Sequence, residues 1–239
     1  MKQEIAHREY RELPAANTYA SAVAQLQKAA SEFYKGKSEI LHPTFVKDNG
    51  SIIFRPLTFK EDLVAIVEDF ETLRNPDGSK RSTAERLTLF NNYKDSCTGI
   101  KYKKNSTKFK IEPVCKDLIT IPPGFNRPFI GIDYESASGI ELDSSKGKYS
   151  QLLTKKQVLE LPAWKEAAEG DTEILKTYTN IVFKALKQDE AMGFWPLQNT
   201  QEDQLRALYV FNLVGSSGAG GNYDLDDDAR LLLVQPKAP

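Results

Sequence analysis

Apolar residues recur at the spacing of an amphipathic helix in several parts of the chain. This spacing puts the apolar side chains on one face of a helix, which can then pack against a core. The predicted helices cover 17–34, 63–73, 82–93 and, in two or three pieces, 155–187. Ser82 with Glu85 forms a capping box at the third start, and Asp171 caps the clearest late helix.

Short apolar runs between turn residues predict strands. Asn49-Gly50 separates the runs 40–46 and 51–55, which favours a hairpin. A second hairpin is expected across 97–115, and a further strand at 118–121. The stretch 122–150 is rich in Gly, Ser, Pro and Asp and predicts long irregular structure. Late strands are expected at 192–197, 206–213 and 229–234.

This order of elements predicts an α+β fold, because the helices form separate groups and the strands need not be parallel. A length of 239 residues fits one large domain. We expect a single domain over 1–239, with a largely helical N-terminal part at 1–95 and the last strands at 191–239. Hydrophobic residues are 40% and charged residues 27%, ordinary for a globular protein.

Charge and apolar runs exclude some classes of partner. The formal net charge is −1, so we expect no nucleic-acid ligand. Lysines within 101–110 alternate with apolar residues, as on a solvated strand face. We expect no membrane insertion, because no apolar run approaches a transmembrane length. The segment 1–13 lacks a signal core, which leaves the location open, a cell-surface or extracellular one included.

The two cysteines, Cys97 and Cys115, lie on opposite strands of the second predicted hairpin. A turn centred on Ser106 would place them opposite each other, within reach of a disulfide. Two reduced thiols packed as small apolar residues are the equal alternative. The sequence leaves both open, and no CxxC spacing indicates a metal.

Residues for catalysis are sparse, and we expect no enzyme and no cofactor. Only His7 and His42 are present, which gives little material for a His-based triad or a zinc site. Ser145 and Lys148 match SxxK without its partner motifs. A hydrolase using a carboxylate pair such as Asp133 and Asp143 stays a distant alternative.

The segment between Leu208 and Ala229 has an unusual composition. Lys, Glu, Gln, Met and Trp are absent from it, whereas Asn, Gly, Ser, Asp and Tyr abound. The absent types cannot be reached from an Asn codon by changing only its adenines, and the abundant ones can. The pattern therefore indicates Asn codons with replaced adenines, and so a binding surface that varies. Gly, Ser, Asn and Asp are also ordinary loop residues, which is the plainer interpretation.

The sequence ALYVFNLVGSSGAGGNYDLDDDARLLLV, within Arg206–Val234, resembles the variable region of diversity-generating retroelement variable proteins, in particular the archaeal branch. GFWPLQNTQEDQLRAL just before it is similar to the constant lead-in of that family. There an error-prone reverse transcriptase rewrites adenines from a template repeat. The resemblance implies a C-type-lectin-like fold, here with extra helices and long irregular segments, that presents a variable ligand site.

We therefore expect a receptor-like protein that binds varied ligands, chiefly protein surfaces. The expected contacts are Phe211, Asn212, Val214, Gly215, Ser216, Ser217, Gly218, Gly220, Asn222, Tyr223, Asp224, Asp226, Asp227 and Asp228. Leu213, Ala219, Gly221, Leu225, Ala229 and Arg230 are expected to form the supporting frame. The alternative is a calcium-dependent carbohydrate-binding lectin that uses the Asp cluster, although the EF-hand spacing is absent and we assign no metal.

Overall fold

The structure is a computed structural model. It describes residues 8–35, 45–48, 51–72, 79, 92–122, 125, 129–213, 215–222, 225 and 228–236. No helix within these ranges is long and apolar enough to cross a membrane.

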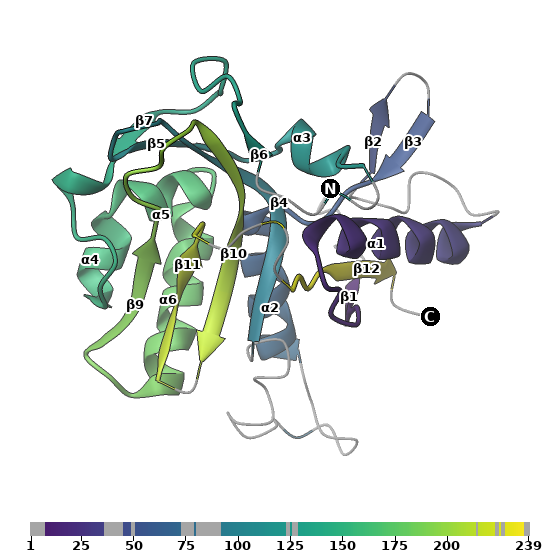
Figure 1. The fold of residues 1–239 in the computed structure, drawn as a ribbon. Helices are drawn as coiled ribbons and strands as arrows, with labels where there is room; N and C mark the ends of the chain where they lie inside the picture. Colours follow the sequence, from purple (N-terminus) through teal and green to yellow (C-terminus); the bar gives the residue numbers. More distant parts are fainter. Residues whose placement is uncertain are drawn as a thin grey trace, which may run out of the picture.

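A central mixed sheet organises the chain (Figure 1), with the strand order β7-β5-β4-β10-β11-β9-β8 and with β6 paired to β10. Its strands are β4 (Asn92–Tyr102), β5 (Lys108–Glu112), β6 (Phe129–Ile130), β7 (Glu141–Asp143), β8 (Leu153–Thr154), β9 (Glu190–Trp195), β10 (Gln204–Leu213) and β11 (Ser216–Gly220). All pairs are antiparallel except β11 with β9. The long strand β10 lies near the middle and contacts β4 on one side and β11 on the other.

Four helices cover one face of the sheet, here called the helical face (Figure 1). They are α2 (Phe59–Thr72), α4 (Lys155–Glu160), α5 (Pro162–Ala167) and α6 (Thr172–Leu186). The core beneath them is aromatic at its centre, where Trp164 packs against Phe59 and Phe194 with ring centroids 5.8 and 6.0 Å apart. All three side chains are fully buried, so this core fixes the sheet from behind.

A second hydrophobic cluster covers part of the opposite face, here called the outer face. It contains residues of α1 (Tyr19–Tyr34) and α3 (Lys116–Ile119) and Leu233 of β12 (Leu232–Pro236). β12 pairs with β1 (Arg8–Glu12), and the Tyr10 side chain of β1 packs against the first cluster. The hairpin of β2 (Phe45–Asp48) and β3 (Ser51–Phe54) lies beside α1. Leu205 and Ala207 bring the first half of β10 into this cluster, which leaves the second half of the outer face less covered.

The long periodic helices predicted from sequence are confirmed as α1, α2 and α6. Thr18 caps α1, and Asp171 caps α6 as predicted. The strand predicted at 118–121 is wrong: Lys116–Ile119 form the short helix α3, whose Leu118 and Ile119 are buried. A short apolar run does not distinguish a strand from one helical turn. The helix predicted at 82–93 lies outside the described residues, apart from its last two, which begin β4.

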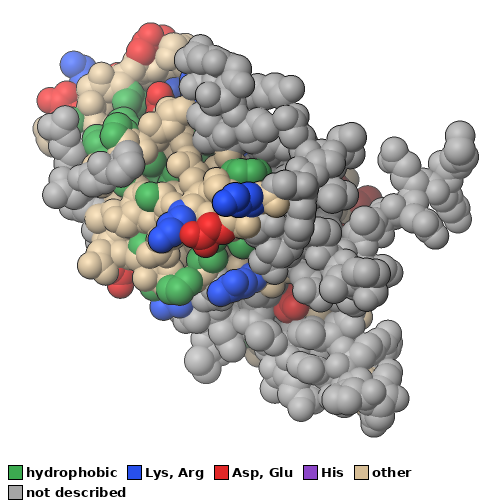
Figure 2. All heavy atoms as spheres, turned by 90° about the vertical axis from the view of Figure 1, so that its right-hand side faces the viewer, with side chains coloured by type: hydrophobic (Ala, Val, Ile, Leu, Met, Phe, Trp, Pro, Cys, Tyr) green, Lys and Arg blue, Asp and Glu red, His purple; other side chains and the backbone are tan. Residues whose placement is uncertain are grey.

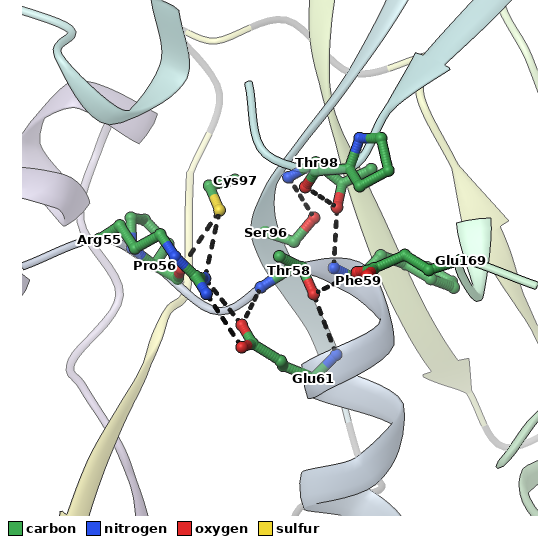
Figure 3. A network of polar contacts seen from close by, with 10 residues as sticks. Arg55, Pro56, Thr58, Phe59, Glu61, Ser96, Cys97, Thr98 and Glu169 are labelled. Carbon is green, nitrogen blue, oxygen red and sulfur yellow. Dashed lines mark hydrogen bonds and ion pairs between the residues drawn. The ribbon is translucent and has the colours of Figure 1, made fainter. Parts of the chain in front are cut away.

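A polar network joins the start of α2 to β4 (Figure 3). Thr58 and Glu61 form a capping box: the Thr58 N–H donates to Glu61 (2.8 Å), and the Glu61 N–H donates to Thr58 Oγ1 (3.2 Å). Arg55 donates to both oxygens of Glu61, at 2.7 and 2.9 Å. Thr98 Oγ1 accepts from the N–H of Phe59 (2.9 Å), which ties the helix directly to the strand.

Lys101 of β4, Lys103 just after it, and Lys108 and Lys110 of β5 lie on the outer face, and the first three pair with carboxylates. Lys101 contacts Glu112 at 3.0 Å, and Lys103 contacts Glu135 at 2.7 Å. The segment 131–140 covers this face further: the Lys110 ammonium lies 4.8 Å from the ring centre of Tyr134 and donates to the carbonyls of Tyr134 (3.5 Å) and Ala137 (3.4 Å). The predicted solvated strand face is thus partly covered. On the side where the termini lie, Figure 2 shows Lys, Arg, Asp and Glu side chains close together among hydrophobic ones on the described surface.

Both cysteines are buried free thiols. The Cys97 Sγ donates to the carbonyl of Pro56 (3.2 Å), and the side chain of Cys115 packs over Gly99 within the second cluster. The Cys115 N–H donates to the Cys97 carbonyl at 2.9 Å, so the two backbones are neighbours as predicted, but the two sulfur atoms contact different residues. Burial raises the pKa of each thiol to about 12. Of the two alternatives left open by the sequence, the structure has the packed thiols.

Candidate functional site

A row of aromatic side chains crosses the outer face over β9, β10 and β4. The ring centroids of Trp195 (β9) and Phe211 (β10) are 5.0 Å apart, and those of Phe211 and Tyr209, on the same strand, are 6.0 Å apart. Tyr209 in turn lies 6.3 Å from Tyr93 of β4, and the Arg230 guanidinium lies 5.8 Å from the Tyr93 ring centre. Trp195, Phe211 and Tyr93 are partly exposed. We call these four rings the aromatic row.

Glycines form the floor under this row. A Cβ added at Gly218 would lie 2.2 Å from Trp195 Cζ3 and 2.8 Å from Phe211 Cζ. One added at Gly220 would lie 2.3 Å from Tyr209 Cζ, and one at Gly193 would lie 2.4 Å from Trp195 Cη2. Real Cβ atoms do not approach other heavy atoms so closely, so the rings occupy space that only glycine leaves free.

The segment after β11 is fixed at intervals along the edge of the row. The Gly221 N–H donates to the Trp195 carbonyl (3.1 Å), and the Leu225 carbonyl accepts from Tyr19 N–H (3.0 Å). Ala229 forms an antiparallel bridge with Ala16. Leu225 and Ala229 are 1% and 2% exposed, and Ala219 and Gly221 are buried, which confirms that these frame residues pack inward.

Arg230 is held by Asp95 of β4. The Asp95 carboxylate accepts from the Arg230 N–H at 2.9 Å, and the Asp95 N–H donates to the Arg230 carbonyl at 2.8 Å. This reciprocal pair fixes the Arg230 backbone, from which the guanidinium extends over the Tyr93 ring. Burial raises the pKa of Tyr93, the hydrogen bond from Arg230 lowers it, and the nearby charges of Asp95 and Asp228 raise it. Asp228 is exposed and therefore puts a negative charge at this end of the row.

Several of the predicted contacts lie on the outer face. Phe211 and Ser216 are partly exposed, and Gly215, Asn222 and Asp228 are exposed. Gly218 and Gly220 are on the same face, but the rings bury them. Asn222 Oδ1 accepts a hydrogen bond from the Tyr209 hydroxyl at 2.8 Å, so this exposed residue is joined to the row. Val214, Tyr223, Asp224, Asp226 and Asp227 lie outside the described residues.

Two of the predicted contacts point the other way. Asn212 is 2% exposed and Ser217 is fully buried, and both face α6. The Tyr178 hydroxyl of α6 donates to Asn212 Oδ1 (3.0 Å) and lies 3.1 Å from Ser217 Oγ. The predicted strand ended at Leu213 and a loop was expected after it, but Ser216–Gly220 form β11, which pairs with Tyr209–Leu213 of β10. Side chains alternate between the two faces of a strand, so every second residue turns inward.

The contact with Tyr178 leads to a stability prediction. Replacing Tyr178 by Phe removes the hydroxyl, so the buried Asn212 Oδ1 and Ser217 Oγ each lose a hydrogen bond. We expect a loss of about 1–3 kcal/mol in the free energy of unfolding, measured by urea titration. Tyr149→Phe is the control, because that ring is 8% exposed and its hydroxyl makes no hydrogen bond within the described residues. Equal losses in the two variants would contradict this role of the Tyr178 hydroxyl.

The aromatic row was only partly found from sequence. Phe211 was among the predicted contacts, whereas Trp195, Tyr209 and Tyr93 were not. Tyr209 and Phe211 are separated by one residue in a predicted strand, and that alternation places both on one face. Tyr93 was missed because its segment was assigned to a helix. Trp195 joins the row because β9 pairs in parallel with β11, and no local sequence pattern reveals that pairing.

The distant catalytic alternative involves residues that stabilise turns. Asp143 accepts hydrogen bonds from Thr107 Oγ1 (2.6 Å) and Ser145 Oγ (2.7 Å), and these bonds lower its pKa to about 2. Asp133 accepts from the N–H groups of Glu135 (3.1 Å) and Ser136 (3.3 Å). Such contacts hold local backbone geometry. His7 and His42 lie outside the described residues.

The comparisons with known proteins bear on the fold. No family model matches the chain, and no curated protein matches it. A solved structure described as "Accommodation of massive sequence variation in Nanoarchaeota by the C-type lectin fold" is similar, with a TM-score of 0.63. The match covers 97% of this chain and 100% of that chain, at 17% sequence identity.

The chain has a C-type lectin fold. This confirms the predicted α+β class with a C-type-lectin-like arrangement. In addition, β1 near the N-terminus pairs with β12 near the C-terminus, which the sequence did not predict. In Figure 1 the paired strands β1 and β12 lie on one side of the molecule and β9 and β11 on the other, with β10 and β4 between them. The fold alone names no ligand.

Proposed function

We propose that this chain is a ligand-binding protein whose C-terminal surface site is diversified by adenine-directed mutagenesis from a retroelement template. Its ligands are varied, and protein surfaces are the chief class. One observation carries the proposal. Some residues of the predicted variable set face outward in the described structure, and they adjoin the aromatic row. The frame residues between them are buried. A surface that varies while its support stays fixed requires this separation.

The chemistry of the outer face suits recognition of proteins. Aromatic side chains give a large contact area with few rotatable bonds, and small polar side chains supply adaptable hydrogen bonds. Trp195, Phe211 and Tyr93 of the row supply the aromatic contact area, and Ser216 and Asn222 supply the adaptable hydrogen bonds. The exposed Asp228 favours a basic or mixed surface as the partner of this variant.

Two further lines support the proposal. The similar solved protein is described in terms of massive sequence variation, and for this chain that property is part of the proposal. In addition, the carboxylates considered for catalysis are engaged in turns, which fits binding better than chemistry.

The gene itself provides the decisive test. Codons for Phe211, Ser216, Gly218, Gly220 and Asn222 should end in a pyrimidine. They should differ from a nearby, nearly identical repeat only at template adenines, and a reverse-transcriptase gene should lie beside that repeat. Purine-ending codons at these positions, with no such repeat, would refute the diversification.

A pair of display libraries tests the geometry of the site. One library randomises the outward positions Phe211, Ser216, Asn222 and Asp228. The matched library randomises the inward positions Val210, Asn212, Ser217 and Ala219, which are buried. We expect the outward library to keep most of the parent's display level and to yield binders to an unrelated protein such as lysozyme. We expect most inward clones to lose display, because core changes commonly cost 1–3 kcal/mol or more. Equal display in the two libraries would contradict the assignment.

A further inference from the structure

We propose that positions 218 and 220 set the specificity of this face by deciding where the rings of Trp195 and Tyr209 lie. Neither ring belongs to the predicted variable set. This inference rests on the proposed function and extends it, since it says how buried variable positions change a ligand surface that they do not reach.

The contact between positions 220 and 209 is the simpler one. A Cβ on residue 220 would lie 2.3 Å from both Cζ and Oη of Tyr209 and 2.8 Å from its Cε1. All three atoms belong to the far end of one side chain, so the tip of that ring has to move. Its hydroxyl donates to Asn222 Oδ1 at 2.8 Å, and the same movement would break that bond. One substitution would therefore shift a ring and release the exposed Asn222.

Position 218 acts on the other end of the row. A Cβ there would lie 2.2 Å from Trp195 Cζ3, 2.8 Å from Phe211 Cζ and 2.7 Å from the Gly193 carbonyl oxygen. The two rings are partly exposed and can turn toward solvent, whereas the contact with the carbonyl is relieved only by a shift of backbone. Trp195 makes the closest contact, so its ring takes up the largest part of the change.

These contacts have a consequence for recognition. A few large aromatic side chains usually carry most of the binding energy of a protein interface. Residues 218 and 220 are buried beneath such side chains, so a small replacement there acts through the rings. Gly215 differs in this respect, because a Cβ on it meets nothing within 4 Å. It provides a matched control for the same substitution.

The first test is a double-mutant cycle between positions 218 and 195. Gly218→Ser and Gly215→Ser are each made in the parent and in a Trp195→Ala background, and Tm is measured. We expect Gly218→Ser to lower Tm by roughly 5 °C or more in the parent and by less than half as much without the indole. Gly215→Ser should change Tm by roughly 1 °C in both. If Gly218→Ser alone fails to fold, Trp195→Ala should restore folding. An undiminished cost in the Trp195→Ala background would overturn the proposal.

The second test follows the ring itself. In a Trp164→Phe background, Trp195 is the remaining tryptophan, since the chain has two. We expect Gly218→Ser to raise its acrylamide quenching constant about twofold relative to Gly215→Ser, as expected for a partly buried ring that turns into solvent. An unchanged constant would overturn the proposal. Gly220→Ser paired with Tyr209→Ala gives the parallel cycle at the other ring. These measurements need neither a ligand nor the gene pattern, so their failure is distinct from failure of the proposed function.

Discussion

Replacing Glu61 by Ala should lower the free energy of unfolding by about 2–4 kcal/mol. The Glu61 carboxylate accepts from the Thr58 N–H and from both terminal nitrogens of Arg55, at 2.7 to 2.9 Å. Loss of a helix N-terminal cap typically costs about 1 kcal/mol, and a hydrogen bond to a charged group contributes about 1.5–3 kcal/mol. The Arg55 side chain is only 11% exposed, so its charge would stay largely buried without a partner.

Glu160→Ala is the matched control for this change. Glu160 also pairs with a basic residue, Lys156, but the two side chains are 62% and 83% exposed and 3.8 Å apart. An exposed pair of this kind contributes at most about 0.5 kcal/mol. Urea unfolding of both variants at neutral pH gives the comparison. A loss at Glu61 no larger than that at Glu160 would show that the network in Figure 3 is not a major source of stability.

The pH dependence of stability should change when Asp62 is replaced by Asn. Asp62 of α2 is fully buried, and neither carboxyl oxygen has a hydrogen-bond partner within the described residues. Burial raises its pKa well above the usual value; Glu61 and Asp95 raise it further, while Lys94 and Arg55 lower it. The folded state therefore holds a proton that the unfolded state releases near pH 4.

The sign of the effect follows from this difference in bound protons. The stabilising contribution of the proton is complete below the unfolded pKa, about 3.9, and declines as pH rises toward the raised folded pKa. Across that window the parent should lose stability relative to Asp62→Asn, with a slope approaching 1.4 kcal/mol per pH unit. Urea unfolding from pH 4 to 8 measures it. Glu160 is largely exposed when folded and also when unfolded, so the stability of Glu160→Gln should depend on pH in the same way as that of the parent. Parallel curves for Asp62→Asn would be the contrary result.

The fold followed from sequence where an element carries its own periodicity. The apolar stripes in α1, α2 and α6 and the cap Asp171 are local, so the sequence alone predicted them. The strand β11 was not, because Ser216–Gly220 has no β-branched or aromatic residue. Its pairing with β9 and β10, and the rings that cover its glycines, come from distant segments.

The sequence predicted which segment forms the candidate site but not on which face of the sheet each of its side chains lies. Codon-like composition indicated which stretch varies, but it carries no information about which face each side chain occupies. Asn212 and Ser217 show this, since their neighbours Phe211 and Ser216 are partly exposed while they contact Tyr178. Only the register of the β10–β11 hairpin separates the two sets.

The fixed points after β11 limit the kinds of change that this region accepts. Gly221, Leu225 and Ala229 are each held by backbone hydrogen bonds to β9, α1 or the segment before α1, and they recur every four residues. Exchanging a side chain between these points leaves the backbone hydrogen bonds in place. Adding or removing a residue would shift every later residue away from its hydrogen-bond partner. Point substitution is therefore the tolerated route of change here, and insertions or deletions between 221 and 229 should be selected against.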